Sequence, residues 1–232
     1  MFDLDGTLVE TAGEIRDAVN DTLTQFALAR VGEEQVARWI GHGTRSLLAQ
    51  AVAFSAATTR AQVQASAGFD GLAAEFARHY QRRCGTRSRL YPHVRDVLGE
   101  LRRCGIKLAM VTNKEAAFAR RILEQHQLLP LLDDVVCGDD APAKKPDPAG
   151  LLACMARLDV DARRALFVGD SGIDVAAARN ARVPIWAVTY GYNLGRPIAA
   201  EAPDRLLADV RPLRELVRGV ATPAAMSGLD RA

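Results

Sequence analysis

The stretch that decides the fold reads ALFVGDSGID, residues 165–174. Its first half is a short apolar run of the kind that forms a buried strand, and its second half opens a helical stretch at 172–181. Asp170 and Asp174 lie at this junction. Open α/β sheets place their sites where strands end and helices begin. The stretch therefore predicts a buried strand with two carboxylates at its carboxyl end.

Similar apolar runs recur elsewhere in the second half of the chain. Further strands are predicted at 107–111, 134–137 and 184–188. Helical spacing of apolar residues separates them, at 115–126 and 148–158. Strands that alternate with helices indicate a parallel sheet with right-handed crossovers. We predict an α/β fold, a doubly wound parallel sheet, whose core comprises residues 1–12 and 89–220.

Residues 13–88 have a different pattern, with apolar side chains every three or four positions and no convincing strand. A segment of this length is too long for a loop and is predicted to be an all-helical cap subdomain inserted into the core. The last residues, 221–232, are rich in Ala, Gly and Pro. We expect them to form a mobile tail.

The bulk composition excludes several classes of protein. The 232 residues carry 30 Lys and Arg against 28 Asp and Glu, interspersed and without a basic block, so neither nucleic acid nor a membrane is expected as a partner. Four cysteines lie far apart and form no CxxC pair, and the chain starts without an apolar leader. These features predict a reduced, cytoplasmic compartment.

Four carboxylates form the first group of candidate site residues. Asp3 and Asp5 stand two positions apart before a glycine, and both cannot be buried without partners. Around a metal ion, one can attack an electrophile while the other handles protons. Asp170 and Asp174 add oxygen ligands of the kind that Mg²⁺ prefers. The alternatives are a solvated Asp-Gly turn for the first pair and helix capping for Asp170.

Two more polar elements follow predicted strands. Thr112 and Asn113 offer a hydroxyl and backbone N–H groups at a helix start, which can bind an anion, although ordinary capping is the alternative. Lys145 precedes Pro146 at another helix start and can place an ammonium beside a phosphate; a solvated surface lysine is the alternative. Because all these elements follow strands, a parallel sheet brings them to one edge.

Four motifs give the chain a resemblance to the haloacid dehalogenase superfamily. They read FDLDGTLV at 2–9, VTNK at 111–114, KPDP at 145–148 and GDSGID at 169–174. The resemblance implies a doubly wound α/β core with a helical cap inserted soon after the first motif. Asp5 argues against dehalogenase chemistry, because the dehalogenases are expected to lack this acid. The resemblance therefore implies a magnesium-dependent phosphatase.

Further stretches resemble the phosphoglycolate phosphatases within that superfamily. They read WIGHG at 39–43, YPHV at 91–94, GDD at 138–140, VTYGYN at 188–193 and GRPI at 195–198. The implied substrate is a small phosphorylated metabolite, first of all 2-phosphoglycolate, and the implied setting is carbohydrate metabolism. A phosphatase or mutase of a sugar phosphate, or an inactive phosphate-binding relative, is the alternative. Thr7 favours hydrolysis, because such mutases often carry Val there.

The resemblance also implies a role for each carboxylate. Asp3 would be the nucleophile that forms an aspartyl-phosphate, and Asp5 would protonate the leaving group and then deprotonate water. Mg²⁺ would be held by the Asp3 carboxylate, the backbone carbonyl of Asp5 and the Asp170 carboxylate. Asp174 would orient a metal-bound water or the neighbouring lysine.

The remaining implied roles concern the substrate. Thr112 and the N–H of Asn113 would bind phosphate oxygens, and Lys145 would offset their charge. In the predicted cap, Arg45 or His42 would face the far end of the substrate; an arginine on a solvated helix start is the alternative.

The start of the chain departs from the motif pattern. Only Met1 and Phe2 precede Asp3, whereas this architecture places a whole central strand there. Without that strand, we expect unpaired backbone groups on the neighbouring strands in a buried place. We therefore expect that the true start lies upstream or that the chain was truncated.

Overall fold

A parallel sheet forms the centre of the molecule. The computed structural model describes residues 1–220, and the predicted mobile tail at 221–232 lies outside the described residues. The strands are β3 (Ala109–Val111), β4 (Asp134–Val136), β5 (Phe167–Gly169), β6 (Ile185–Val188) and β7 (Arg205–Leu207). β3 pairs with β4, and β6 pairs with both β5 and β7, all in parallel. Each of these strands is only three or four residues long, and most are apolar throughout because strands of a parallel sheet are buried on both faces.

The first three residues join the two halves of this sheet. The Phe2 N–H donates to the Ala109 oxygen at 2.9 Å, and the Asp3 N–H donates to the Val168 oxygen at 2.9 Å. The Val111 N–H in turn donates to the Phe2 oxygen at 2.8 Å. The expectation of unpaired backbone groups at this central position is therefore wrong, because residues 1–3 pair with β3 and β5 at once. The same pairing places Asp3 at the carboxyl edge of the sheet.

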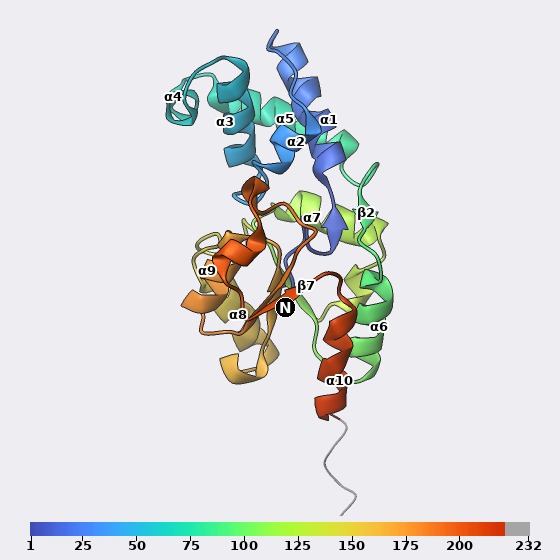
Figure 1. Cartoon of the computed structure of the whole chain (residues 1–232). Coiled ribbons are helices and arrows are strands. Elements are labelled where there is room, and N and C mark those ends of the chain that lie inside the picture. The colour runs from blue at the N-terminus through green and yellow to red at the C-terminus, as the bar shows by residue number, and fades with distance from the viewer. Residues whose placement is uncertain (221–232) are drawn as a thin grey trace, which may run out of the picture.

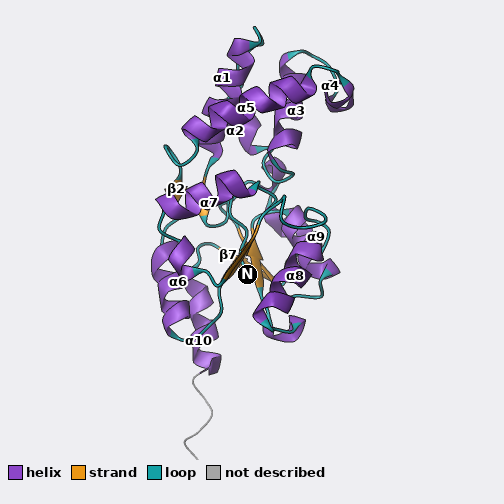
Figure 2. Ribbon diagram, turned by 180° about the vertical axis from the view of Figure 1, so that it is seen from behind, coloured by secondary structure: helices purple, strands orange, loops and turns teal. Residues whose placement is uncertain are grey.

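Helices cover both faces of the sheet, as the doubly wound prediction requires. Figure 2 shows the strands between α8 (Ala149–Leu158) and α9 (Gly172–Asn180) on one side and α6 (Val94–Arg103) and α10 (Glu215–Val220) on the other. α7 (Ala116–Gln125) follows β3. The core between these layers is apolar, with Leu108, Met110 and Phe167 at most 1% exposed. Burial of each such side chain contributes roughly 1.5–3 kcal/mol. The α/β fold class is confirmed.

Short 3₁₀ helices complete the connections of this part. They are η1 (Leu129–Leu131), η2 (Ala162–Arg164), η3 (Asn193–Gly195), η4 (Ile198–Glu201) and η5 (Arg211–Arg214). Within the described residues, none of the helices combines the length and the apolar character that crossing a membrane requires.

Five helices occupy residues 12–83, which we call the helical segment. They are α1 (Ala12–Gln25), α2 (Glu33–Ala37), α3 (Thr44–Ser55), α4 (Arg60–Ala65) and α5 (Phe69–Arg83). Figure 1 shows them gathered at one end of the molecule, with α1 against α5. No strand lies in this range, all of which the structure describes. The division of the chain into a core and a cap with limits at 12 and 89 stays a prediction.

The helical segment is connected to the sheet by two neighbouring stretches of chain. β1 (Val9–Glu10) leads out and β2 (Arg89–Leu90) leads back, and they pair antiparallel. Both ends of the helical segment therefore meet at the same place, beside the carboxyl edge where Asp3 lies.

Candidate active site

Three buried carboxylates meet at the carboxyl edge of the sheet. Asp3 follows the residues that pair with β3 and β5, and Asp170 and Asp174 lie where β5 passes into α9. Oxygen atoms of the three side chains lie within 4.8 Å of one another. The structure thus brings together residues that are up to 171 positions apart, as the parallel topology leads one to expect.

This clustering makes ionisation of the carboxylates unfavourable. Burial raises the pKa of Asp3 to about 6; Lys145 opposes the shift and Asp174 adds to it. The pKa of Asp170 is raised well above its ordinary value, by burial first and then by the charges of Asp174 and Asp3. A cation among these oxygen atoms would favour the ionised forms, and carboxylate oxygens suit a hard divalent cation.

Glycines allow the chain to approach Asp170 closely. The Thr7 hydroxyl donates to Asp170 Oδ1 at 3.0 Å, and the Tyr192 N–H donates to Oδ2 at 2.7 Å. A Cβ at Gly6 would lie 2.4 Å from Oδ2, and Gly6 has a φ of +85°. A Cβ at Gly191 would lie 2.2 Å from the Asp170 Cβ. Both glycines are therefore required by the packing around this carboxylate.

Lys145 lies between two of the carboxylates. Its Nζ is 2.7 Å from Asp3 Oδ1 and 2.6 Å from Asp174 Oδ1, and its side chain is 3% exposed. Burial alone would lower the pKa of this lysine, but the charges of Asp174 and Asp3 outweigh burial and raise it. The backbone is fixed as well, because the Lys145 N–H donates to Asn113 Oδ1 at 2.7 Å and the Asn113 amide returns a bond to the Lys145 oxygen at 2.9 Å.

Asp174 also has a structural role. It forms a capping box with Ser171 at the start of α9, and its Oδ2 accepts bonds from the Ser171 N–H at 3.1 Å and hydroxyl at 2.6 Å. Its other oxygen contacts Lys145. The contact with Lys145 fits the orienting role expected for Asp174.

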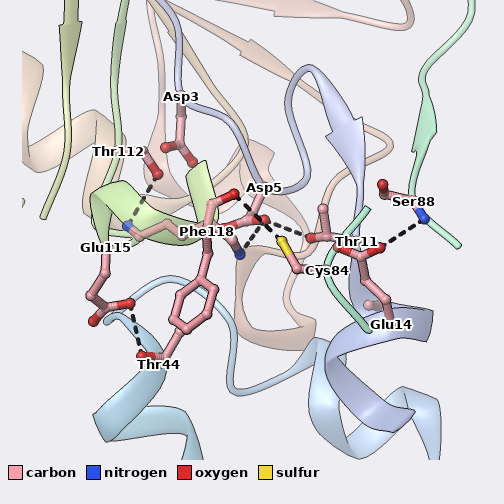
Figure 3. A network of polar contacts seen from close by, with 12 residues as sticks. Asp3, Asp5, Thr11, Glu14, Thr44, Cys84, Ser88, Thr112, Glu115 and Phe118 are labelled. Carbon is pink, nitrogen blue, oxygen red and sulfur yellow. Dashed lines mark hydrogen bonds and ion pairs between the residues drawn. The ribbon is translucent and has the colours of Figure 1, made fainter. Parts of the chain in front are cut away.

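The Asp5 carboxylate has a different set of partners. Lys114 Nζ lies 2.9 Å from each of its oxygens, and the Thr11 hydroxyl donates to Oδ1 at 2.7 Å. Figure 3 shows the Thr11 contact beside Asp3 and Thr112. The Thr112 hydroxyl accepts a bond from the Lys114 N–H at 3.2 Å. Sequence reasoning gave no role to Lys114, although this lysine directly follows the expected anion site at 112–113.

The four carboxylates named above face two buried ammonium groups, those of Lys114 and Lys145. If all are ionised, two negative charges remain unbalanced. A divalent cation carries the charge that neutralises them. Charge and donor type therefore both fit a magnesium-like ion at this edge.

A small cavity lies between this edge and the helical segment. It is lined by Asp3, Asp5, Ile15, Ile40, Gly41, Gly43, Thr44, Leu47, Thr112, Asn113 and Lys114. The sheet edge supplies the charged wall and the helical segment supplies the apolar one. A molecule that fills this cavity would contact both walls.

Neither Arg45 nor His42 is part of this lining. The Arg45 guanidinium lies 2.6 Å from the Asp70 carboxylate, and its centre is 4.8 Å from the centroid of the Phe69 ring. The structure thus places Arg45 on an exposed face of the helical segment. Its expected contact with substrate stays a prediction.

Two further contacts join the helical segment to the rest of the molecule, and Figure 3 shows one bond of each. The Thr44 hydroxyl donates to Glu115 Oε2 at 2.8 Å. Glu14, fully buried in the first turn of α1, accepts N–H bonds from Gly85, Arg87 and Ser88 at 2.9, 3.3 and 3.0 Å. The Glu14 carboxylate therefore fastens the chain that leaves the helical segment after α5 to the first turn of α1.

The chain is similar to known hydrolases over most of its length. A family model described as haloacid dehalogenase-like hydrolase matches residues 1–188. The chain is 38% identical to a phosphoglycolate phosphatase of Pseudomonas putida, over 97% of this chain and 80% of that protein. It is 37% identical to a phosphoglycolate phosphatase of Vibrio cholerae, over 93% of this chain and 95% of that protein. The solved structure of a predicted phosphoglycolate phosphatase from Haemophilus somnus superimposes with a TM-score of 0.85 at 30% identity, covering 93% of this chain and 95% of that chain.

Proposed function

The chain belongs to the haloacid dehalogenase-like hydrolases, and from this premise we propose that it is a magnesium-dependent phosphatase that converts 2-phosphoglycolate to glycolate and phosphate. The observation that carries the chemistry is the buried group of Asp3, Asp170 and Asp174 with the Lys145 ammonium among them. The relatives named above, one of them matched over 95% of its length, support the choice of substrate.

Magnesium would be held by the carboxylates of Asp3 and Asp170 and by the backbone carbonyl of Asp5. When bound, the ion supplies positive charge that neutralises the cluster and the phosphate oxygens. Asp174 would contribute by fixing Lys145, which its Oδ1 contacts at 2.6 Å.

Asp3 is the nucleophile in this proposal. Its carboxylate oxygen attacks phosphorus, a P–O bond to Asp3 forms, and the bond to the glycolate oxygen breaks. An anion that approaches each charge of a phosphate at ~4 Å is opposed by about 4 kcal/mol at an effective dielectric near 20. Lys145, 2.7 Å from Asp3, offsets part of that repulsion. Fixed charges of this kind account for most of the catalysis of phosphoryl transfer.

Asp5 donates and accepts the protons in this proposal. It gives a proton to the departing glycolate oxygen and then takes one from the water that attacks the aspartyl-phosphate, which restores the Asp3 carboxylate and releases phosphate. Asp5 and Asp3 line the same cavity, as this double role requires. Thr112 and the N–H of Asn113, which line it too, would bind the phosphate oxygens.

A panel of phosphate esters tests the proposal. We expect Mg²⁺-dependent release of phosphate with the highest kcat/KM for 2-phosphoglycolate, ahead of sugar phosphates and neutral esters. Asp3→Asn should abolish the release of phosphate. Asp96→Asn, which removes an exposed carboxylate in the first turn of α6, should leave it unchanged. Faster turnover of a sugar phosphate would contradict the choice of 2-phosphoglycolate as the substrate. Activity that survives Asp3→Asn would contradict the role of Asp3 as the nucleophile.

A further inference from the structure

A second buried lysine, Lys114, has no role in the mechanism above. Its side chain is 2% exposed, and its Nζ lies at the same distance, 2.9 Å, from both oxygens of Asp5. Lys114 also lines the cavity beside Asp3 and Asp5. A buried ammonium is costly unless it is paired, so this contact is a strong constraint on both side chains.

The contact controls how Asp5 can turn. Apart from Lys114, the side-chain partner that the structure shows for the Asp5 carboxylate, within the part of the chain it describes, is the Thr11 hydroxyl on Oδ1. Without the ammonium, Oδ2 would have no partner and the carboxylate could rotate about its last bond. The ammonium therefore fixes the plane of the group that transfers protons.

The helical segment in turn holds the ammonium. The Lys114 Nζ lies 5.1 Å from the centroid of the Tyr80 ring on α5, an arrangement that attracts a cation. Tyr80 is fully buried, and its ring centroid is 4.5 Å from that of Phe118 on α7. The lysine is thus enclosed between the sheet edge and the helical segment, and it cannot move away from Asp5 without repacking both.

We propose that Lys114 is a positioning residue that holds the Asp5 carboxylate in the orientation used for both proton transfers. This inference rests on the proposed function, which assigns those transfers to Asp5. Loss of Lys114 should impair the steps that need a positioned proton donor or base. Steps that need neither should proceed almost as before.

Two esters of similar size separate these effects. Benzyl phosphate has an alkoxide leaving group that must be protonated, whereas 4-nitrophenyl phosphate releases a phenolate that leaves without a proton. For Lys114→Met we expect kcat/KM to fall about 10- to 100-fold with benzyl phosphate, because a misplaced acid loses part of the roughly 10²–10⁴-fold that general acid–base catalysis contributes. With 4-nitrophenyl phosphate the fall should be less than about threefold. Hydrolysis of the aspartyl-phosphate should then limit turnover and produce a burst of nitrophenolate, because the base is misplaced.

Several variants keep the test decisive. Lys107→Met is the matched control, because that lysine donates to the Leu158 oxygen on the exposed surface. Lys114→Gln keeps a hydrogen-bond donor and should lie between wild type and Lys114→Met, which provides a measurement if the Met variant does not fold. In an Asp5→Asn background, Lys114→Met should cause no further loss with either ester. Thermal denaturation checks that each variant is folded.

The outcomes distinguish this inference from the proposed function. An equal loss with both esters, or a further loss in the Asp5→Asn background, would show a merely structural lysine while the proposed function stands. Wild-type protein that releases no phosphate from 2-phosphoglycolate, or an Asp3→Asn variant that remains active, would remove the proposed function itself.

Discussion

Two ion pairs with the same separation lie in opposite surroundings in this molecule. Lys145 and Asp174 at the sheet edge are 2.6 Å apart with side chains 3% and 1% exposed. Arg45 and Asp70 on the helical segment are also 2.6 Å apart, but they are 57% and 87% exposed. The exposed pair exchanges its contact for water at little cost, whereas the buried pair has no such exchange. Burial, rather than distance, therefore sets how costly each pair is to break.

Of the two pairs, the buried one should show the larger effect on disruption, and Lys145→Met removes its cation. It leaves Asp3 and Asp174 without their shared partner, so we expect kcat to fall by roughly 10²–10³-fold, as for loss of one charge-stabilising donor. The free energy of unfolding should fall by about 3 kcal/mol, the scale for a broken buried pair. Steady-state kinetics and urea denaturation measure the two effects, with Lys107→Met as the exposed lysine control. Activity within threefold of wild type would contradict the role of Lys145.

Apolar runs predicted most of the sheet, for a physical reason. The strands expected at 107–111 and 184–188 appear as β3 and β6, because buried parallel strands need continuous apolar residues. β7 was not predicted. It lies at the edge of the sheet, and its three residues begin with Arg205, so its sequence has no signal of a buried strand.

The site was predictable where its residues lie in the connections that follow strands. Asp3, Asp170 and Lys145 meet at one edge because the parallel topology requires it. Lys114 and Glu14 were not predicted, because the burial of a charged side chain depends on partners that are remote in sequence. Lys114 pairs with a carboxylate 109 positions away, and Glu14 accepts bonds from residues 71 to 74 positions away. Periodicity and spacing do not encode such partners.

The buried carboxylate of Asp3 should also make the stability of the protein depend on pH. In metal-free protein, burial raises the pKa of Asp3 from an ordinary 3.8 to about 6. The folded state therefore holds this proton more tightly than the unfolded state. The resulting stability is fully present below pH 3.8 and is lost as the pH rises through about 6.

Asp3→Asn isolates this contribution, because the variant lacks the titrating group. In EDTA, we expect the free energy of unfolding of Asp3→Asn to rise relative to wild type by about 1–3 kcal/mol between pH 4 and pH 7. Urea denaturation at several pH values measures the difference. Asp96→Asn, which removes an exposed carboxylate in the first turn of α6, is the control variant. A difference between Asp3→Asn and wild type that stays constant across this range would show that Asp3 ionises as freely as a surface carboxylate.

The smallest effect on stability is expected at the exposed pair. Arg45→Ala should change the free energy of unfolding by less than about 1 kcal/mol, because surface ion pairs contribute little. The same variant tests the hypothesis that Arg45 faces the carboxylate of the substrate. If it does, kcat/KM should fall several-fold more for 2-phosphoglycolate than for a neutral phosphate ester. Asp70→Ala is the matched control, because it breaks the same ion pair and leaves the arginine in place. Equal changes for the two esters would show that Arg45 does not contact the substrate and only forms the surface ion pair with Asp70. The contrast between the two ion pairs would then hold for function as well as for stability.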